Sequence, residues 1–196
     1  MSFFRCLPGA DALSAFRQQR LLASLAEQGI SLASIQAQYL HFVWSDSALS
    51  DIQLVVLEGL LMYGEPFTVA EPKAGWLASL GKSPQPSQAI AIPRFGTVSP
   101  WASKATDIAH QCGLPILRIE RGIQYTWVAQ GSLSTQEQQT VLAALHDRMT
   151  ETVVDSVDAV APLYQTLEDR PLLRIPVMAE GEAALEKANL ELGLAL

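Results

Sequence analysis

The chain has 196 residues, of which 49% are hydrophobic and 17% charged, and its formal net charge at pH 7 is −7. This composition is typical of a folded globular protein and excludes an intrinsically disordered chain. The negative charge argues against nucleic acid as a partner. No stretch approaches the roughly 18 apolar residues of a membrane span, and Met1–Arg5 lack the apolar core of a signal peptide. We therefore expect a cytoplasmic protein with no membrane partner.

Residue spacing predicts two strands and two helices in the first part of the chain. A short strand is expected over Ser2–Leu7, followed by a helix over Asp11–Gln28 that Gly29 ends. The aromatic-rich segment Ser34–Trp44 predicts a long strand. A second helix is expected from Ser50 to Met62.

The same order of elements is expected again after an irregular connection. Residues 64–88 contain four prolines and three glycines, which favour a surface connection without regular structure. The later elements are a strand over Gln88–Ile92, a helix over Ser99–Gln111, a strand over Ile116–Ala129 with a bulge at Gly122, and a helix that begins at Ser134 and runs well past His146.

Two matching helix starts indicate an internal duplication. Leu49–Gln53 and Leu133–Glu137 each place Leu before Ser, with Gln or Glu three residues after the Ser, at a spacing of 84 residues. This is the pattern of a capping box preceded by an apolar residue. We predict an α+β fold for residues 1–149, in which two strand–helix–strand–helix units form one continuous, mainly antiparallel sheet with helices on one face.

Residues 150–196 differ in composition and form a separate predicted segment. From Arg148 to Leu196 there are nine acidic residues against four basic ones, and three prolines interrupt the segment. A final amphipathic helix is expected over Glu180–Leu192. The pattern fits equally a helical linker that needs a packing partner and a C-terminal helix that folds back on its own domain.

The sequence contains no complete set of catalytic residues. It has neither a glycine-rich phosphate loop nor a nucleophile elbow, and His41, His110 and His146 lie far apart without metal-ligand spacing. Cys112 is expected at a helix C-terminus, where the helix dipole opposes formation of a thiolate. We predict no catalytic residue, no metal site and no cofactor on this chain.

One segment, Pro93–Gly113, combines polar and cationic residues at a predicted junction between a strand and a helix. Free backbone N–H groups at a helix N-terminus, together with hydroxyl groups and cations, suit an anionic ligand. The alternative is that Ser99 is a simple N-cap, Pro100 occupies the first helical turn and Trp101 belongs to the core. The candidate residues are Arg94, Thr97, Ser99, Trp101, Ser103 and Lys104, and Arg118 and Arg121 are further cations nearby in the sequence.

This segment closely resembles the N-terminal domain of large single-chain phosphoribosylformylglycinamidine synthase, a glutamine-dependent amidotransferase of purine biosynthesis. The family usually has Pro, Ile and Ser where this chain has Phe95, Val98 and Ala102. The resemblance covers nearly the whole chain. Further matching segments are Leu13–Arg17, Tyr39, His41–Phe42, Arg118–Gly122, His146–Glu151, Ala188–Leu190 and Leu192–Leu196.

The resemblance implies a part in converting formylglycinamide ribonucleotide to formylglycinamidine ribonucleotide with ATP, Mg²⁺ and glutamine. In that family the N-terminal domain resembles a dimer of the small subunit of multi-subunit versions, and a linker joins it to the synthetase core. The expected partners are therefore the synthetase and glutaminase domains of the same parent chain. The six candidate residues would face the substrate region or a domain interface. The alternative is a free-standing ferredoxin-like regulatory or protein-interaction domain.

Overall fold

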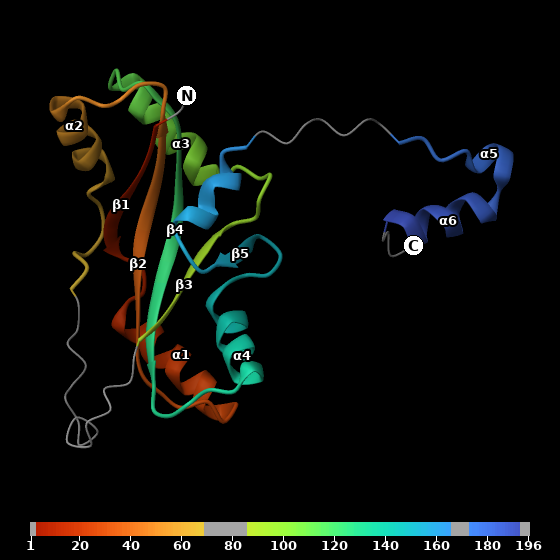
Figure 1. Cartoon of the computed structure of the whole chain (residues 1–196), viewed down its shortest axis with the longest axis horizontal. Coiled ribbons are helices and arrows are strands. Elements are labelled where there is room, and N and C mark those ends of the chain that lie inside the picture. Colours follow the sequence, from red (N-terminus) through yellow and green to blue (C-terminus); the bar gives the residue numbers. More distant parts are fainter. Residues whose placement is uncertain (1–2, 69–85, 166–172, 193–196) are drawn as a thin grey trace. The chain divides into compact units, whose positions relative to one another are not determined.

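The computed structural model describes residues 3–68, 86–165 and 173–192, and the chain divides into two compact units, Met1–Gln165 and Thr166–Leu196. Figure 1 shows the elements of the first unit. In chain order they are β1 (Phe3–Asp11), α1 (Ala15–Glu27), β2 (Leu32–Ser45), α2 (Asp51–Leu61), β3 (Ser87–Pro93), α3 (Pro100–Gln111), β4 (Ile116–Ala129), α4 (Thr135–Leu145), β5 (Glu151–Val154) and the 3-10 helix η2 (Asp158–Leu163).

The five strands form one sheet in the order β1-β2-β4-β3-β5, and every neighbouring pair is antiparallel. The α+β fold with an antiparallel sheet is therefore confirmed. β2 and β4 lie at the centre and pair from Leu32 opposite Ala129 to Ser45 opposite Ile116. The sheet also continues past residue 149, because β5 pairs with β3 through Ile90 and Val154.

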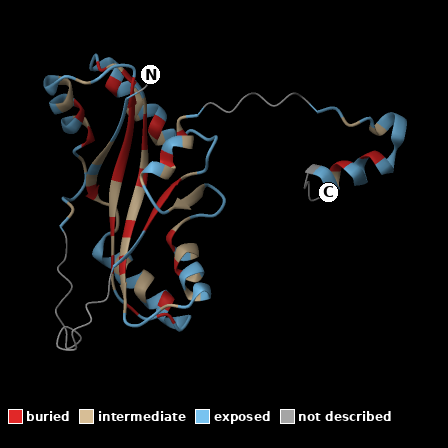
Figure 2. Ribbon diagram, viewed as in Figure 1, coloured by how far each residue is buried: buried red, intermediate tan, exposed pale blue. Residues whose placement is uncertain are grey.

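Helices α1 to α4 cover one face of the sheet, as predicted, in two pairs at its two ends (Figure 1). Side chains alternate between the faces of a strand, so every second residue of β2 and β4 points to these helices. The buried positions run along both central strands in Figure 2. The α1/α4 core contains Leu25, Ile35, Ala37, Tyr125, Trp127 and Val141, and the α2/α3 core contains Val43, Leu57, Leu61, Ala109, Ile116 and Ile119.

The opposite face of the sheet is covered over part of its length by η2. Val160 and Leu163 of η2 are buried against Phe42 and Trp44 of β2. The Trp44 ring also stacks on Tyr164, with ring centroids 5.5 Å apart. This second apolar layer explains why β2 is buried on both faces near its C-terminal end, where Leu40 to Ser45 are all buried.

The helix caps confirm the internal match between the two repeats. Ser50 and Gln53 form a complete capping box at the start of α2, and Ser134 and Glu137 form the same box at the start of α4. Each box satisfies two backbone N–H groups that a helix start would otherwise leave unpaired. The repeated element order is therefore accompanied by the same local chemistry at the same place in each repeat.

Two helix boundaries of the first unit differ from the prediction by more than one residue. β1 continues through Pro8 and Gly9 to Asp11, which pairs with Gln38, so α1 begins only after the N-cap Ser14. The prediction that the helix from Ser134 continues past His146 was wrong. α4 ends at Leu145, because His146 has an extended backbone with φ −145° and ψ 155°.

Gly122 does not form the predicted bulge. It pairs in register with Leu40, and no register shift falls near it. A Cβ atom at this position would lie 2.8 Å from Cε2 of Phe42 and 2.9 Å from the backbone oxygen of Ala91. The glycine therefore permits a close approach of neighbouring strands and side chains.

The second unit contains two short helices, α5 (Val177–Glu180) and α6 (Glu182–Leu192). Gly181, with φ of 62°, separates them, so the predicted final helix begins two residues later than Glu180. Ala184 and Ala188 are buried on one side of α6, whereas Leu185 and Leu190 are exposed. The predicted connection over residues 64–88 falls largely outside the described residues.

Candidate functional site

The junction between β3 and α3 is held by a serine cap that is bonded to a buried carboxylate. The Ser99 Oγ accepts a hydrogen bond from the Ala102 backbone N–H at 3.0 Å. The same hydroxyl donates to Oε1 of Glu120 at 2.6 Å, and the Ser99 backbone N–H donates to Oε2 at 3.3 Å. Ser99 is therefore the N-cap of α3, as the second of the two alternatives predicted. Its bond to Glu120 also joins the start of α3 to β4.

Glu120 is completely buried and paired with Arg118. The Arg118 Nη2 lies 2.8 Å from Oε2 of Glu120, and the Arg118 side chain is itself only 15% exposed. Arg118 also donates to the backbone oxygens of Thr97 and Leu163, at 2.8 and 2.7 Å. One ion pair thus connects β4, the loop before α3 and η2. Such a pair is costly to break, because either partner alone leaves a buried charge without compensation.

Three of the six predicted residues line one hollow beside this junction. Arg94, Thr97 and Ser99 face Met149 and Glu151 across a cavity of about 350 Å³. The Arg94 guanidinium is exposed and donates to the Met149 oxygen at 3.4 Å, and the Thr97 hydroxyl donates to the Arg94 oxygen at 2.6 Å. The hollow therefore offers one exposed cation next to one carboxylate.

The other three predicted residues lie elsewhere. Trp101 and Lys104 line a groove of about 300 Å³ between α2 and α3, together with Leu60 and Ile108. Ser103 is exposed on α3 and lines neither space. The structure therefore divides the predicted anion site into two separate places.

A second polar cluster lies on the helical face, between the two cores. The Arg121 guanidinium carbon lies 4.4 Å from the ring centre of Tyr39, 4.8 Å from that of Trp101 and 5.9 Å from that of Tyr63. A guanidinium enclosed by aromatic rings is stabilised by cation–π attraction. The His41 ring stacks on Trp101 with centroids 5.7 Å apart. We call Tyr39, His41, Tyr63, Trp101 and Arg121 the aromatic cluster.

His41 is fully buried in this cluster and is held in its neutral form. Its Nε2 lies 2.7 Å from the hydroxyl of Tyr63. Burial, and secondly the charge of Arg121, lower the pKa of His41 from 6.5 to about 4. Burial raises the pKa of Tyr63. At neutral pH the pair is therefore an uncharged hydrogen bond beside a permanent cation.

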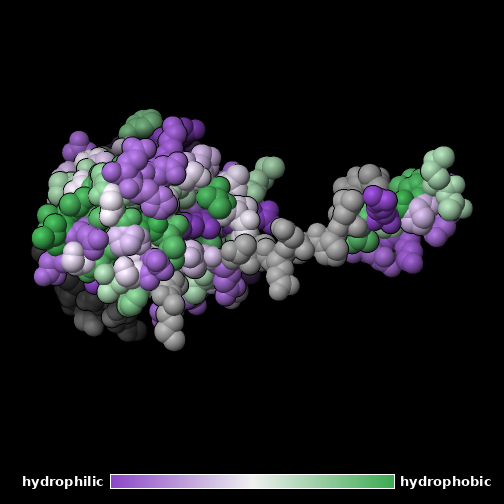
Figure 3. Space-filling model, turned by 90° about the horizontal axis from the view of Figure 1, so that it is seen from above, coloured by the Kyte–Doolittle hydropathy of each residue, from purple (hydrophilic) through white to green (hydrophobic). Residues whose placement is uncertain are grey.

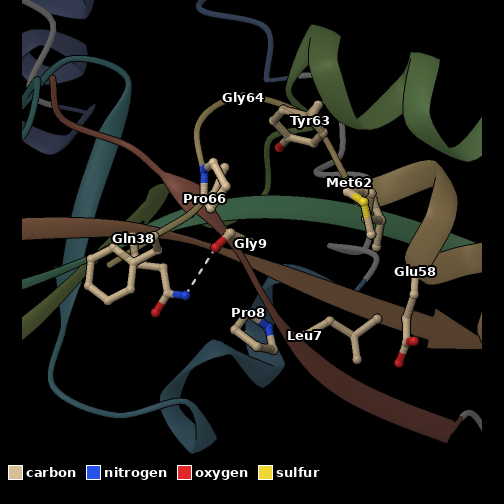
Figure 4. A pocket seen from close by; sticks show the side chains of 12 residues that line it. Leu7, Pro8, Gly9, Gln38, Glu58, Met62, Tyr63, Gly64 and Pro66 are labelled. Carbon is tan, nitrogen blue, oxygen red and sulfur yellow. Dashed lines mark hydrogen bonds between the residues drawn. The ribbon is translucent and has the colours of Figure 1, made fainter. Parts of the chain in front are cut away.

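A further hollow lies on the β1 side of the sheet (Figure 4) and has a volume of about 530 Å³. Its walls are mainly apolar, with Leu7 and Pro8 from β1 and Met62 and Pro66 from the segment after α2. The Gln38 amide donates to the Gly9 oxygen at 3.0 Å at the rim. No motif in the sequence indicated this hollow, because it depends on how the segment after α2 returns to β1.

The sequence predicted the cap at Ser99, but not the roles of the other residues in these networks. Arg118, Glu120 and Arg121 belong to a segment that resembles the amidotransferase family, and they are neighbours in the sequence. On a strand, Arg118 and Arg121 point to opposite faces, so one is buried in the ion pair and the other in the aromatic cluster. Tyr63 directly follows the predicted helix that ends at Met62, and its long-range bond to His41 has no sequence signal.

The described part of the chain holds no group of three or more His, Cys, Asp or Glu side chains placed to bind a metal ion. Within the same residues, none of the helices has the length and apolar character needed to cross a membrane.

Fold and site together define a duplicated α+β domain whose buried polar groups are used to hold its own elements in place. The family model for the N-terminal region of formylglycinamide ribonucleotide amidotransferase matches residues 38–164, which is more than half of the chain. The chain belongs to this family, and its role is in the amidotransferase of purine biosynthesis. The matched range includes the Ser99–Glu120–Arg118 network and the whole aromatic cluster.

Replacing Glu120 by Gln should destabilise the protein by about 3 kcal/mol, because Arg118 loses the counter-charge for its buried guanidinium. Urea unfolding followed by tryptophan fluorescence measures this loss. Glu27→Gln, on the exposed surface of α1, is the matched control and should leave the midpoint unchanged. Equal midpoints for the two variants would show that the buried pair does not hold the junction.

The free energy of unfolding should fall as the pH is lowered from 7 to 4. The folded-state pKa of His41 is about 4 and lies below the ordinary pKa of histidine, 6.5, so the unfolded chain binds the proton first. The stabilisation from neutral His41 is therefore complete above about pH 6.5 and is lost as pH falls toward 4. The loss should be of order 3 kcal/mol.

Denaturation curves at several pH values check this dependence. His41→Gln should flatten the dependence between pH 6.5 and 4, whereas His146→Gln should retain it, because His146 is only partly buried on the far helix pair. A parallel pH dependence in all three proteins would exclude His41 as the titrating group.

Proposed function

We propose that this chain is a noncatalytic domain that supports the assembly of formylglycinamide ribonucleotide amidotransferase. The family match over residues 38–164 carries this proposal. It is supported by the way that Ser99, Arg118 and Glu120 are bonded to one another and to backbone groups, so that these bonds hold the elements of the domain together. Their geometry suits a rigid junction better than a reacting group.

The chemistry of the amidotransferase belongs, in this proposal, to other parts of the parent protein. ATP, Mg²⁺ and glutamine would be bound by its synthetase and glutaminase domains in the cytoplasm, and this chain would bind no cofactor. Its contribution would be to hold those domains in a productive arrangement.

Assay of the 196-residue chain with formylglycinamide ribonucleotide, ATP, Mg²⁺ and either glutamine or ammonia should give no product. The complete amidotransferase is the positive control, and removal of this domain from it should abolish or strongly reduce turnover. Product formation by the chain alone would overturn the noncatalytic role. Full activity of the enzyme without the domain would overturn the assembly role.

The hollow at Arg94 is the part of the chain that we propose to face the substrate region of the amidotransferase. Arg94 and Thr97 are exposed there, and the Arg94 guanidinium is available to an anion such as the substrate phosphate. Lys104 opens into the separate groove between α2 and α3. Substitution of Arg94 therefore tests the hollow beside Met149, and substitution of Lys104 tests the groove between α2 and α3.

In the complete amidotransferase, Arg94→Gln should raise KM for formylglycinamide ribonucleotide about tenfold with kcat unchanged, as expected for loss of one charge-assisted hydrogen bond. Lys104→Gln is the matched control and should leave KM unchanged. Steady-state kinetics and a thermal melt of each variant provide the measurement. Unchanged KM in the Arg94 variant would assign this hollow to a domain interface instead.

A further inference from the structure

Helix α2 has an apolar stripe on its outer surface as well as on its inner one. Leu57 and Leu61 are buried against the sheet, which is the usual arrangement of an amphipathic helix. On the outer side, however, Ile52 is 79% exposed and Val55 is 70% exposed, with Val56 beside them. These three residues are spaced at i, i+3 and i+4, so they form one continuous stripe rather than scattered apolar residues.

The second repeat provides an internal reference for this stripe. The capping boxes align Ser50 with Ser134, so that Leu57 and Leu61 of α2 correspond to Val141 and Leu145 of α4, all four of them buried. The outer positions differ: α4 has Gln136, Gln139 and Thr140 where α2 has Ile52, Val55 and Val56.

Two helices in equivalent positions of the same fold thus have the same kind of inner surface but opposite outer surfaces. The outer face of α4 is suited to water. Folding of this domain gives no reason for the outer face of α2 to be apolar, because α4 occupies its position without one.

The stripe continues into the hollow beside β1. Met62, directly after α2, is 82% exposed and lines that hollow together with Leu7 and Pro8. Figure 4 shows Met62 and the acidic Glu58 on the same wall. In Figure 3, green residues gather at the left of the larger unit, the side on which Figure 1 shows α2. The apolar surface therefore combines a convex stripe with an adjoining concavity.

The charges on the segment that carries this surface indicate the kind of partner. Residues 46–68 include four acidic side chains and no lysine or arginine. The acidic residues are Asp46, Asp51, Glu58 and Glu65. A second copy docked through the same stripe would bring these carboxylates against one another, which disfavours self-association. A partner with an apolar centre and a basic rim would be attracted instead.

We propose that the outer face of α2, with Met62 and the hollow beside β1, docks another part of the amidotransferase that presents an apolar patch rimmed by Lys or Arg. This inference rests on the proposed assembly function and names the surface that performs it. Burial of adjacent apolar residues at the centre of a contact, with charges at its rim, is the usual composition of a specific interface.

Hydrogen–deuterium exchange compares α2 with α4 in the 196-residue chain and in the complete amidotransferase. The amides of α2 should exchange at least about tenfold more slowly in the complete protein, whereas the amides of α4 should change little. Equal exchange of α2 in the two proteins would overturn the docking surface.

A triple substitution that copies α4 onto α2, Ile52→Gln, Val55→Gln and Val56→Thr, tests the stripe directly. The variant chain should remain folded, because Gln has a higher helix propensity than Ile or Val and Thr a similar one, and the buried side of α2 is unchanged. In the complete amidotransferase, the variant should remove the extra protection of α2. The control, Gln136→Ala with Gln139→Ala on α4, should retain it.

Analytical ultracentrifugation of the chain alone distinguishes the proposed partner from a second copy of the chain. A monomer, both with and without the triple substitution, is expected. A dimer that the triple substitution dissociates would overturn the proposed partner in favour of a second copy. The two proposals also fail separately: if removal of the whole domain abolishes turnover while α2 shows no added protection, the assembly role stands and this surface is excluded.

Discussion

β2 and β4 pair along almost their whole length, and the rest of the domain is arranged around that pairing. Each strand has 14 residues, which corresponds to about 46 Å at the rise of an extended chain. Helices of 11 to 13 residues span only about 17–20 Å. One pair of helices therefore cannot cover the sheet, and each end requires its own pair and its own core.

The aromatic cluster lies over the centre of the sheet, between the two helix pairs and their cores. Tyr39 and His41 come from β2, and Arg121 comes from β4 directly opposite His41. Trp101 and Tyr63 reach them from α3 and from the end of α2. A permanent cation is tolerated there because three rings surround it. The same pairing sends Arg118 and Glu120 to the other face, where their ion pair fixes the loop before α3.

The sequence predicted those features that depend on neighbouring residues. Both capping boxes, the Ser99 cap and the central strand Ile116–Ala129 follow from local chemistry and were confirmed. β5 was missed because four residues between turns carry too little periodicity. Gly122 was assigned to a bulge because a glycine in a strand fits both a bulge and a close approach, and only the position of Phe42 decides between them.

The candidate site was harder to predict, because residues that are close in sequence can point their side chains in different directions. Arg94, Lys104, Arg118 and Arg121 form a cationic cluster in the sequence, but the structure distributes them over four environments: a hollow, a groove, a buried ion pair and a set of rings. Only two of the four remain exposed to a ligand. The exposed cations Arg94 and Lys104 thus lie in two separate hollows, a division that was not deducible without the pairing register.

The two repeats differ most where one flank of the sheet is covered and the other is not. After α4 the chain returns as β5 and η2. β5 pairs with β3, and η2 buries Phe42 and Trp44. After α2, the described return comprises residues 62–68, which the backbone bond from Asp11 to Glu65 and the side chain of Tyr63 join to the sheet. The flank formed by β1 and α2 thus retains apolar side chains that the corresponding flank has either buried or replaced by glutamine and threonine. A duplicated fold starts with two equal flanks, so the flank that stays apolar, and that no other described residue covers, is the one on which a requirement other than folding acts.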